Sequence, residues 1–104
     1  MESTRRYPRM QKMLLVSFVS AVGGRQTTPV SIGRILDLNP GGLGIELFTP
    51  LDPGAELEME IDLDGTLIQA TGSVVHSRED GEGRWIVGIR LATPDERFAI
   101  GMNA

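Results

Sequence analysis

The sequence predicts an all-β protein: a six-stranded antiparallel β-barrel with a short C-terminal helix and an extended basic N-terminal arm. Apolar and polar residues alternate in six segments, as they do in strands that bury one face. Short turns rich in glycine or proline separate most of these segments, which favours hairpin connections. Closing the strands into a barrel leaves no unpaired sheet edge, and this makes a barrel the preferred architecture.

Length and composition predict one barrel domain over residues 13–104, preceded by the arm over residues 1–12. A chain of 104 residues is long enough to bury a single core. It contains no cysteine and one histidine, so disulfides, a thiolate nucleophile and a zinc knuckle are excluded. This composition is compatible with a reducing cytoplasm, where we expect the protein to reside.

The charge is unevenly distributed along the chain. Residues 1–34 carry six basic residues against one acidic residue, whereas residues 35–104 carry four arginines against thirteen carboxylates. The net charge of −4 argues against general nucleic-acid binding. A basic arm on an acidic body instead indicates a small or local anionic partner.

The arm contains Arg5, Arg6 and Arg9 around Tyr7 and Pro8. Proline and repeated charge disfavour a helix or an inner strand, so we expect extended chain. The guanidinium fork suits phosphate oxygens and the O6/N7 edge of guanine. A solvated basic tail or a targeting segment has the same composition, and the arm alone does not distinguish these interpretations.

The first strand is predicted within Met13–Val22, and a glycine-led loop over residues 23–29 returns the chain. A basic start before an apolar run also begins secretory signals. Pro8 and Lys12 interrupt that pattern, and the run is short, β-branched and partly alternating, which favours a strand. No segment approaches the roughly 20 apolar residues of a membrane-spanning helix.

The next two strands, over residues 31–36 and 43–48, flank a predicted turn from Asp37 to Gly42. Proline at position 40 presets a negative φ, while Gly41 and Gly42 allow positive φ or a close backbone approach. Asp37, Asn39 and the bare glycine backbone are thus presented together at a strand end. Such a cluster can bind a polar planar ligand, or it can close the loop through Asx-type side-chain bonds.

Three further strands are predicted after the loop of residues 49–54. Residues 56–63 alternate acid and apolar, which indicates a solvated carboxylate face more than a cation site. Asp64-Gly65 is a strong hairpin signal before a long strand over residues 66–77.

In that long strand, Gly72 is expected to mark a bulge, and His76 is assigned no role. A hairpin loop over residues 79–83 leads to the last strand, residues 84–91. Trp85 in that strand is expected to be a core or rim aromatic.

The C-terminal helix is predicted from a start signal, with Thr93 at the N-cap, proline at the first helical position and Glu96 three residues after the cap. Phe98 and Met102 stand four residues apart and would bury one stripe against the sheet.

Motifs of known enzyme classes are missing from the sequence. It contains no Gly-x-Ser-x-Gly elbow, no P-loop and no cysteine–histidine pair. We therefore expect a binding module, with no enzymatic activity, catalytic residue, metal site or cofactor.

The arm and the central turn, considered together, resemble a PilZ domain. The family's signature is an R-x-x-x-R motif on an N-terminal arm and a [D/N]-x-S-x-x-G motif on a strand-end turn. Arg5 and Arg9 match the first motif, and Asp37 and Gly42 match the second. The Gly-Leu-Gly-Ile, Gly-Ser-Val-Val and Val-Gly-Ile-Arg-Leu segments also fall where the family has similar strands, so the resemblance covers nearly the whole chain.

This resemblance implies binding of the bacterial second messenger cyclic di-GMP, with the arm folding over the barrel and relaying the signal to a protein partner of unknown identity. The ligand-binding residues carried over, or neighbouring those that match, are Arg5, Arg6, Arg9, Asp37, Asn39, Gly41 and Gly42. Asn39 stands where the family has serine. The alternative is a degenerate PilZ-like module that binds a motility or pilus protein and no nucleotide.

Overall fold

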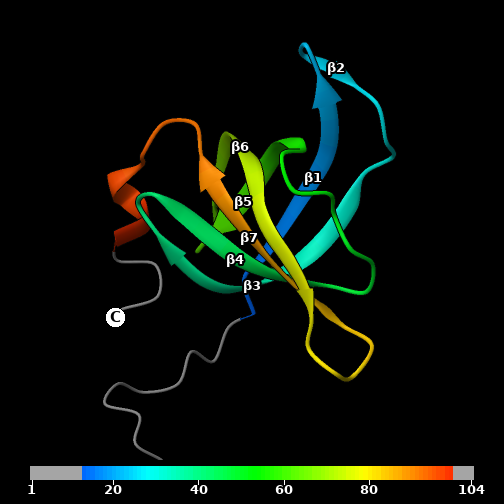
Figure 1. Ribbon diagram of the computed structural model, residues 1–104. Coiled ribbons are helices and arrows are strands. Elements are labelled where there is room, and N and C mark those ends of the chain that lie inside the picture. The colour runs from blue at the N-terminus through cyan, green and yellow to red at the C-terminus, as the bar shows by residue number, and fades with distance from the viewer. Residues whose placement is uncertain (1–12, 100–104) are drawn as a thin grey trace, which may run out of the picture.

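Six long strands wrap into the barrel (Figure 1). Each begins close to where the alternation of the sequence begins. The structure, a computed structural model, describes residues 13–99. Within this range the elements are β1 (Leu15–Val22), β2 (Arg25–Gln26), β3 (Ser31–Asn39), β4 (Gly42–Leu47), β5 (Glu56–Leu63), β6 (Thr66–Glu79), β7 (Trp85–Leu91) and the 3-10 turn η1 (Glu96–Ala99).

All strand pairs are antiparallel, in the order β1-β3-β4-β7-β6-β5, and β5 pairs back onto β1. This last pairing runs from Val16↔Ile61 to Ala21↔Glu56 and closes the barrel. The predicted six-stranded antiparallel barrel is therefore confirmed. Closure leaves each long strand hydrogen-bonded on both sides, which removes the exposed edges of an open sheet.

The core lies inside the barrel and contains the inward-facing residues of the strands. In β5 the alternation is strict: Leu57, Met59 and Ile61 are buried, while the glutamates between them are exposed. The predicted solvated carboxylate face is thus confirmed, and residues 13–99 contain no acid or histidine cluster suited to a metal ion. They also contain no helix long and apolar enough to cross a membrane.

Two-residue turns set the register at both ends of the barrel. Asp64 and Gly65 have φ of 54° and 91°, as a type I′ hairpin requires, which confirms the predicted turn between β5 and β6. Gly23 and Gly24 also have positive φ, and they fold the short strand β2 back onto β1. The loop predicted over residues 23–29 therefore contains a strand that the sequence pattern did not indicate.

The predicted bulge at Gly72 is wrong. Gly72 pairs regularly with Leu57 on one side and with Leu91 on the other. A side chain is excluded there because its Cβ would lie 2.5 Å from the carbonyl oxygen of Arg90 and 3.0 Å from a side-chain carbon of Ile89. Gly72 therefore allows β6 and β7 to approach each other closely. The bulge in β6 lies at Val75 instead.

The C-terminal helix is a single 3-10 turn within the described residues, and its N-cap differs from the prediction. The carboxylate of Asp95, rather than the hydroxyl of Thr93, accepts a hydrogen bond from the backbone N–H of Arg97 at 3.0 Å. The N–H of Phe98 donates to the carbonyl of Asp95 at 3.1 Å. Phe98 is fully buried in the barrel core, as predicted, while Met102 lies outside the described residues.

Candidate functional site

Two β-bulges turn two polar side chains to the outside of the barrel. In β3, Ile35 pairs with Ile45 and Asp37 pairs with Gly44, so Leu36 is an extra residue between them. Uninterrupted alternation from the buried Ile35 would have directed Asp37 into the core. The bulge reverses the facing, and Asp37 is exposed. The turn predicted over residues 37–42 is accordingly shorter, because Asp37 and its two successors belong to β3.

An equivalent bulge in β6 acts on His76. Val74 pairs with Ile89 and His76 pairs with Gly88, which leaves Val75 as the extra residue. Val74 is buried, so His76 would face the core without the bulge; with it, His76 is exposed.

These pairings align four residues in one row across the outer face: Asp37 of β3, Gly44 of β4, Gly88 of β7 and His76 of β6. Neighbouring strands lie about 4.8 Å apart, so the path along the curved wall from Asp37 to His76 is roughly 14 Å. The two glycines between them carry no side chain and form a floor, which we call the glycine floor (Gly44 and Gly88). The row therefore leaves room for the side chains at its two ends to lie against the barrel wall.

The side chains at both ends of the row reach over the glycine floor. A Cβ on Gly44 would lie 2.9 Å from Oδ2 of Asp37, and a Cβ on Gly88 would overlap the imidazole of His76. The carboxylate of Asp37 makes no hydrogen bond or ion pair within residues 13–99. Among these described residues it is an acceptor without a donor, and it lies at the edge of the floor.

Asn39 closes the hairpin between β3 and β4, which confirms the Asx-type alternative for this residue. Its Oδ1 accepts hydrogen bonds from the backbone N–H groups of Gly41, at 2.9 Å, and Gly42, at 3.0 Å. The turn itself consists of Pro40 and Gly41, since Asn39 pairs with Gly42. The Asn39 amide nitrogen makes no hydrogen bond within residues 13–99 and is available as a donor.

The hairpin tip is also tied to the segment after β7. The carbonyl of Gly41 accepts from the N–H of Leu91 at 2.9 Å, and the carbonyl of Pro40 accepts from the N–H of Asp95 at 3.0 Å. Figure 1 shows the tip beside η1. Gly41 therefore uses both backbone groups internally. Gly42 lacks a side chain because a Cβ would overlap the carbonyl oxygen of Ile89.

A groove of about 480 Å³ contains this site. Its lining includes the predicted residues Asp37, Asn39, Gly41 and Gly42, together with His76, Arg78 and Arg90, which sequence reasoning did not select. The only sequence signal for His76, Arg78 and Arg90 was the presence of glycine inside strands, at positions 44 and 88. The bulge that orients His76 depends on strand pairing, which the sequence pattern does not show. Arg5, Arg6 and Arg9 lie outside the described residues.

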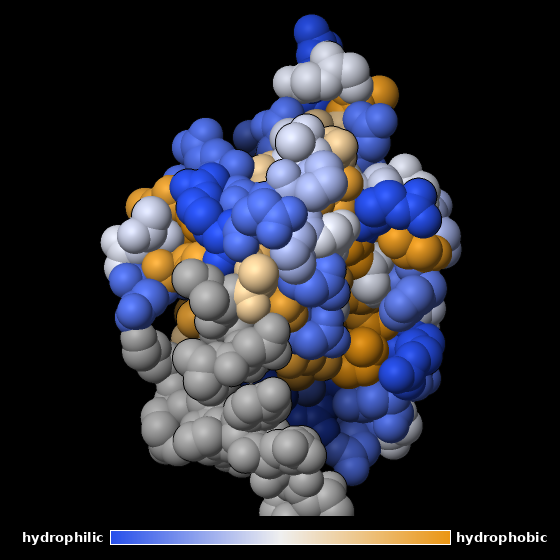
Figure 2. Space-filling model, turned by 90° about the vertical axis from the view of Figure 1, so that its left-hand side faces the viewer, coloured by the Kyte–Doolittle hydropathy of each residue, from blue (hydrophilic) through white to orange (hydrophobic). Residues whose placement is uncertain are grey.

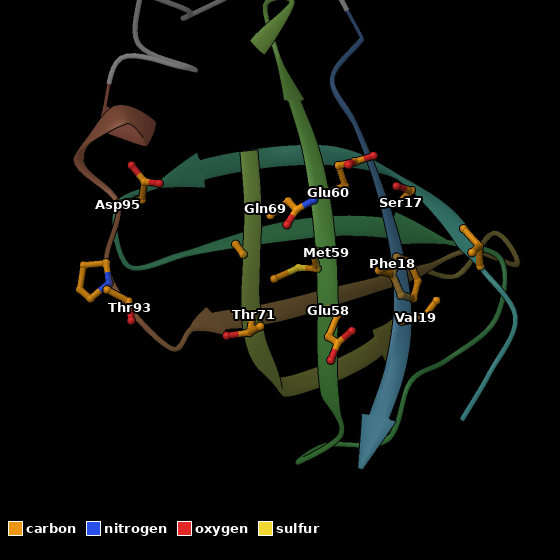
Figure 3. A pocket seen from close by; sticks show the side chains of 13 residues that line it. Ser17, Phe18, Val19, Glu58, Met59, Glu60, Gln69, Thr71, Thr93 and Asp95 are labelled. Carbon is orange, nitrogen blue, oxygen red and sulfur yellow. The ribbon is translucent and has the colours of Figure 1, made fainter. Parts of the chain in front are cut away.

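A larger hollow of about 660 Å³ lies across β1, β5 and β6 (Figure 3). Glu58 and Glu60 line it from β5 and Asp95 lines it from the segment after β7, and no described lining residue is basic. This hollow would repel phosphate groups. The groove of about 480 Å³ is smaller, but its lining has two arginines against one carboxylate. It is therefore the better candidate for an anionic ligand.

A chain of ion pairs lies beside the row, centred on Glu46, which follows Gly44 by two residues on β4. Glu46 lies 3.0 Å from Nε of Arg34 and 3.7 Å from Nε of Arg84, and Asp80 lies 3.4 Å from the same Arg84 nitrogen. The backbone N–H of Glu82, assisted by Arg84, lowers the pKa of Asp80 below its usual value. These pairs fix the neighbouring strand ends and leave Arg78 and Arg90 unpaired within residues 13–99.

The face that carries η1 and the hairpin tip is largely hydrophilic, with apolar residues visible between the polar ones (Figure 2).

Comparison with known proteins identifies the domain type. A family model for the PilZ domain matches residues 3–100. No curated protein matches the chain with significance.

Proposed function

Because the chain belongs to the PilZ domain family, we propose that it is a receptor and adaptor for cyclic di-GMP. PilZ domains are binding or adaptor modules, generally for cyclic di-GMP, rather than catalysts. In this proposal the N-terminal arginine arm becomes ordered on the nucleotide and relays the signal to a protein partner. A cytoplasmic location in a bacterium belongs to the same proposal, since the messenger is made there.

The observation that carries the proposal is the position of Asp37. Its carboxylate is exposed, has no partner within residues 13–99, and lies at the edge of the glycine floor in a groove of about 480 Å³. Such a volume falls in the range of ligand pockets, about 300–1,000 Å³. A carboxylate in this position can accept hydrogen bonds from the N1–H and N2–H groups of guanine.

Asn39 supports the same ligand with its amide nitrogen, a donor that has no acceptor within residues 13–99. Its oxygen closes the turn, so the nitrogen is the group directed to a ligand oxygen. Gly41 and Gly42 contribute to the site because they carry no side chain that would fill the groove at the hairpin. Their N–H groups already donate to Asn39 and are not offered to the ligand. In this proposal Arg5, Arg6 and Arg9 contact phosphates and guanine edges, and ordering the arm costs conformational entropy that those contacts offset.

A second candidate is a protein-interaction module that binds no nucleotide. The observation that favours it is the capping role of Asn39, because both of its accepted hydrogen bonds come from its own turn. The family serine at this position is shorter, so Asn39 fills space that serine would leave open. The motility or pilus partner of this alternative would then be the only ligand of the barrel.

Isothermal titration of cyclic di-GMP into the full chain tests the proposal, with GTP and cyclic GMP as controls. We expect saturable binding that is selective over both controls, and the titration gives the stoichiometry. Replacing Asp37, Arg5 or Arg9 with alanine removes a charged hydrogen-bonding group and should weaken binding by roughly tenfold to a hundredfold. A flat trace from folded wild-type protein would contradict the proposal and favour the protein-interaction module.

A further inference from the structure

His76 stands opposite Asp37 in the cross-strand row, with only the glycine floor between them. Its ring lies on Gly88: a Cβ there would be 2.8 Å from Cε1 and 2.9 Å from Cδ2 of the imidazole. Each of the two side chains owes its outward direction to its own bulge. A carboxylate and an aromatic ring therefore lie over two paired glycines within one groove.

Two guanidinium groups flank the His76–Gly88 pair, one toward each end, because β6 and β7 are antiparallel. Arg78 follows His76 by two residues on β6, and Arg90 follows Gly88 by two residues on β7, so each shares the outer face of its strand. Both are exposed, and neither makes an ion pair or side-chain hydrogen bond within residues 13–99. Arg34, Arg84 and Arg97, by contrast, are each paired with a carboxylate.

We propose that His76, Arg78 and Arg90, here called the β6–β7 wall, form the second side of the nucleotide site. The imidazole stacks on the base whose edge is held by Asp37, and the two guanidiniums face phosphate oxygens. This inference rests on the proposed function. It adds the residues on β6 and β7 that contact the ligand, opposite the contact made by Asp37 on β3.

The physical basis differs for the two kinds of residue. An aromatic ring that borders a glycine floor offers a stacking surface, and a stacked base is commonly held in this way by aromatic or imidazole rings. An arginine already engaged by a carboxylate gains little from a phosphate, whereas an unpaired arginine gains a charge-assisted bond. The wall therefore supplies stacking and positive charge where β3 supplies a hydrogen-bond acceptor.

The test is titration of cyclic di-GMP into the full-length wild type and single variants, each first shown to be folded by its thermal unfolding transition. His76→Ala should weaken binding roughly tenfold, and Arg90→Ala or Arg78→Ala roughly tenfold or more. His76→Phe retains a ring and should stay within a few fold of the wild type, whereas His76→Gln retains a polar side chain and should resemble His76→Ala.

Two matched controls share the chemistry and lie outside the groove. Arg25→Ala removes the same charge from the exposed strand β2, and Gln69→Ala truncates an exposed polar residue elsewhere on β6. Both should bind like the wild type. If the wall variants also bind like the wild type while Asp37→Ala loses affinity, the wall is overturned and the receptor proposal stands. If the folded wild type does not bind at all, both fail together.

Discussion

The carboxylate of Asp37 lies over Gly44, its direct partner across β3 and β4, with Oδ2 at 2.9 Å from the position a Cβ on Gly44 would take. Asp37 is exposed, so its side chain can rotate away from an added methyl group at little energetic cost. Gly44→Ala should therefore leave stability within about 1 kcal/mol of the wild type and weaken cyclic di-GMP binding roughly tenfold. Urea unfolding and calorimetric titration measure the two quantities.

A double-mutant cycle shows whether that effect passes through Asp37. In an Asp37→Ala background, the additional loss from Gly44→Ala should be much smaller than in the wild type, because the displaced carboxylate is already absent. Equal losses in both backgrounds would mean that the methyl group blocks the groove by itself.

Gly42→Ala should behave in the opposite way. A Cβ there overlaps the carbonyl oxygen of Ile89, which is main chain of a paired strand and has no rotamer to change. We expect a loss of about 1–3 kcal/mol in the free energy of unfolding, measured by urea denaturation. A variant as stable as the wild type would show that β4 and β7 are not in such close contact.

The capping role of Asn39 predicts a clear difference between two substitutions. Asn39→Ala leaves the N–H groups of Gly41 and Gly42 without their acceptor and should destabilise the protein by about 1–2 kcal/mol. Asn39→Asp keeps the oxygen and should unfold close to the wild-type midpoint. Asn39→Asp also removes the amide donor, so we expect it to bind the nucleotide more weakly than the wild type. Unchanged affinity would argue against a ligand contact by the Asn39 nitrogen.

Phe98 tests whether η1 is part of the barrel core. Its side chain is fully buried, so Phe98→Ala should cost about 3–5 kcal/mol and lower the thermal midpoint strongly. Phe98→Leu retains most of the apolar volume and should cost less than half as much. Similar midpoints for the two variants would indicate that η1 leaves the barrel before the core unfolds.

Asp80 gives the protein a predictable sensitivity to acid. Hydrogen bonding from the backbone N–H of Glu82, followed in importance by contacts with Arg84, lowers its pKa from the usual 3.8 in the folded state. Its stabilising contribution is therefore present above pH 3.8 and is lost as the pH falls through the lower, folded-state pKa. Denaturant unfolding of Asp80→Asn at pH 7 and pH 3 should show a smaller difference than the wild type shows.

A control for this comparison is Asp52→Asn, which removes the same charge from an exposed loop outside the ion pairs described. It should keep the wild-type difference between the two pH values. An Asp80→Asn variant with an unchanged difference would place the acid sensitivity elsewhere, with Asp95 the next residue to test because Arg97 lowers its pKa in the same direction.

Local sequence patterns account for the six long strands, most of the turns and the family, but not for β2. Glu56–Leu63 alternates without interruption, and Asp64-Gly65 supplies the positive φ values of a tight turn, so local chemistry alone specifies this hairpin. The same kind of rule predicts Thr93 as the helix cap and is wrong here. Asp95, two residues later, caps η1 and also donates its N–H to the carbonyl of Pro40 at the neighbouring hairpin tip.

The set of polar residues that share the groove depends on strand pairing in the folded barrel. A bulge is defined by what the partner strands pair with, and alternation within β3 or β6 would have placed Asp37 and His76 inside the barrel. The glycine floor likewise exists only because Gly44 and Gly88, distant in sequence, are paired. Periodicity records the direction of side chains along one strand, whereas a site built across four strands depends on their register.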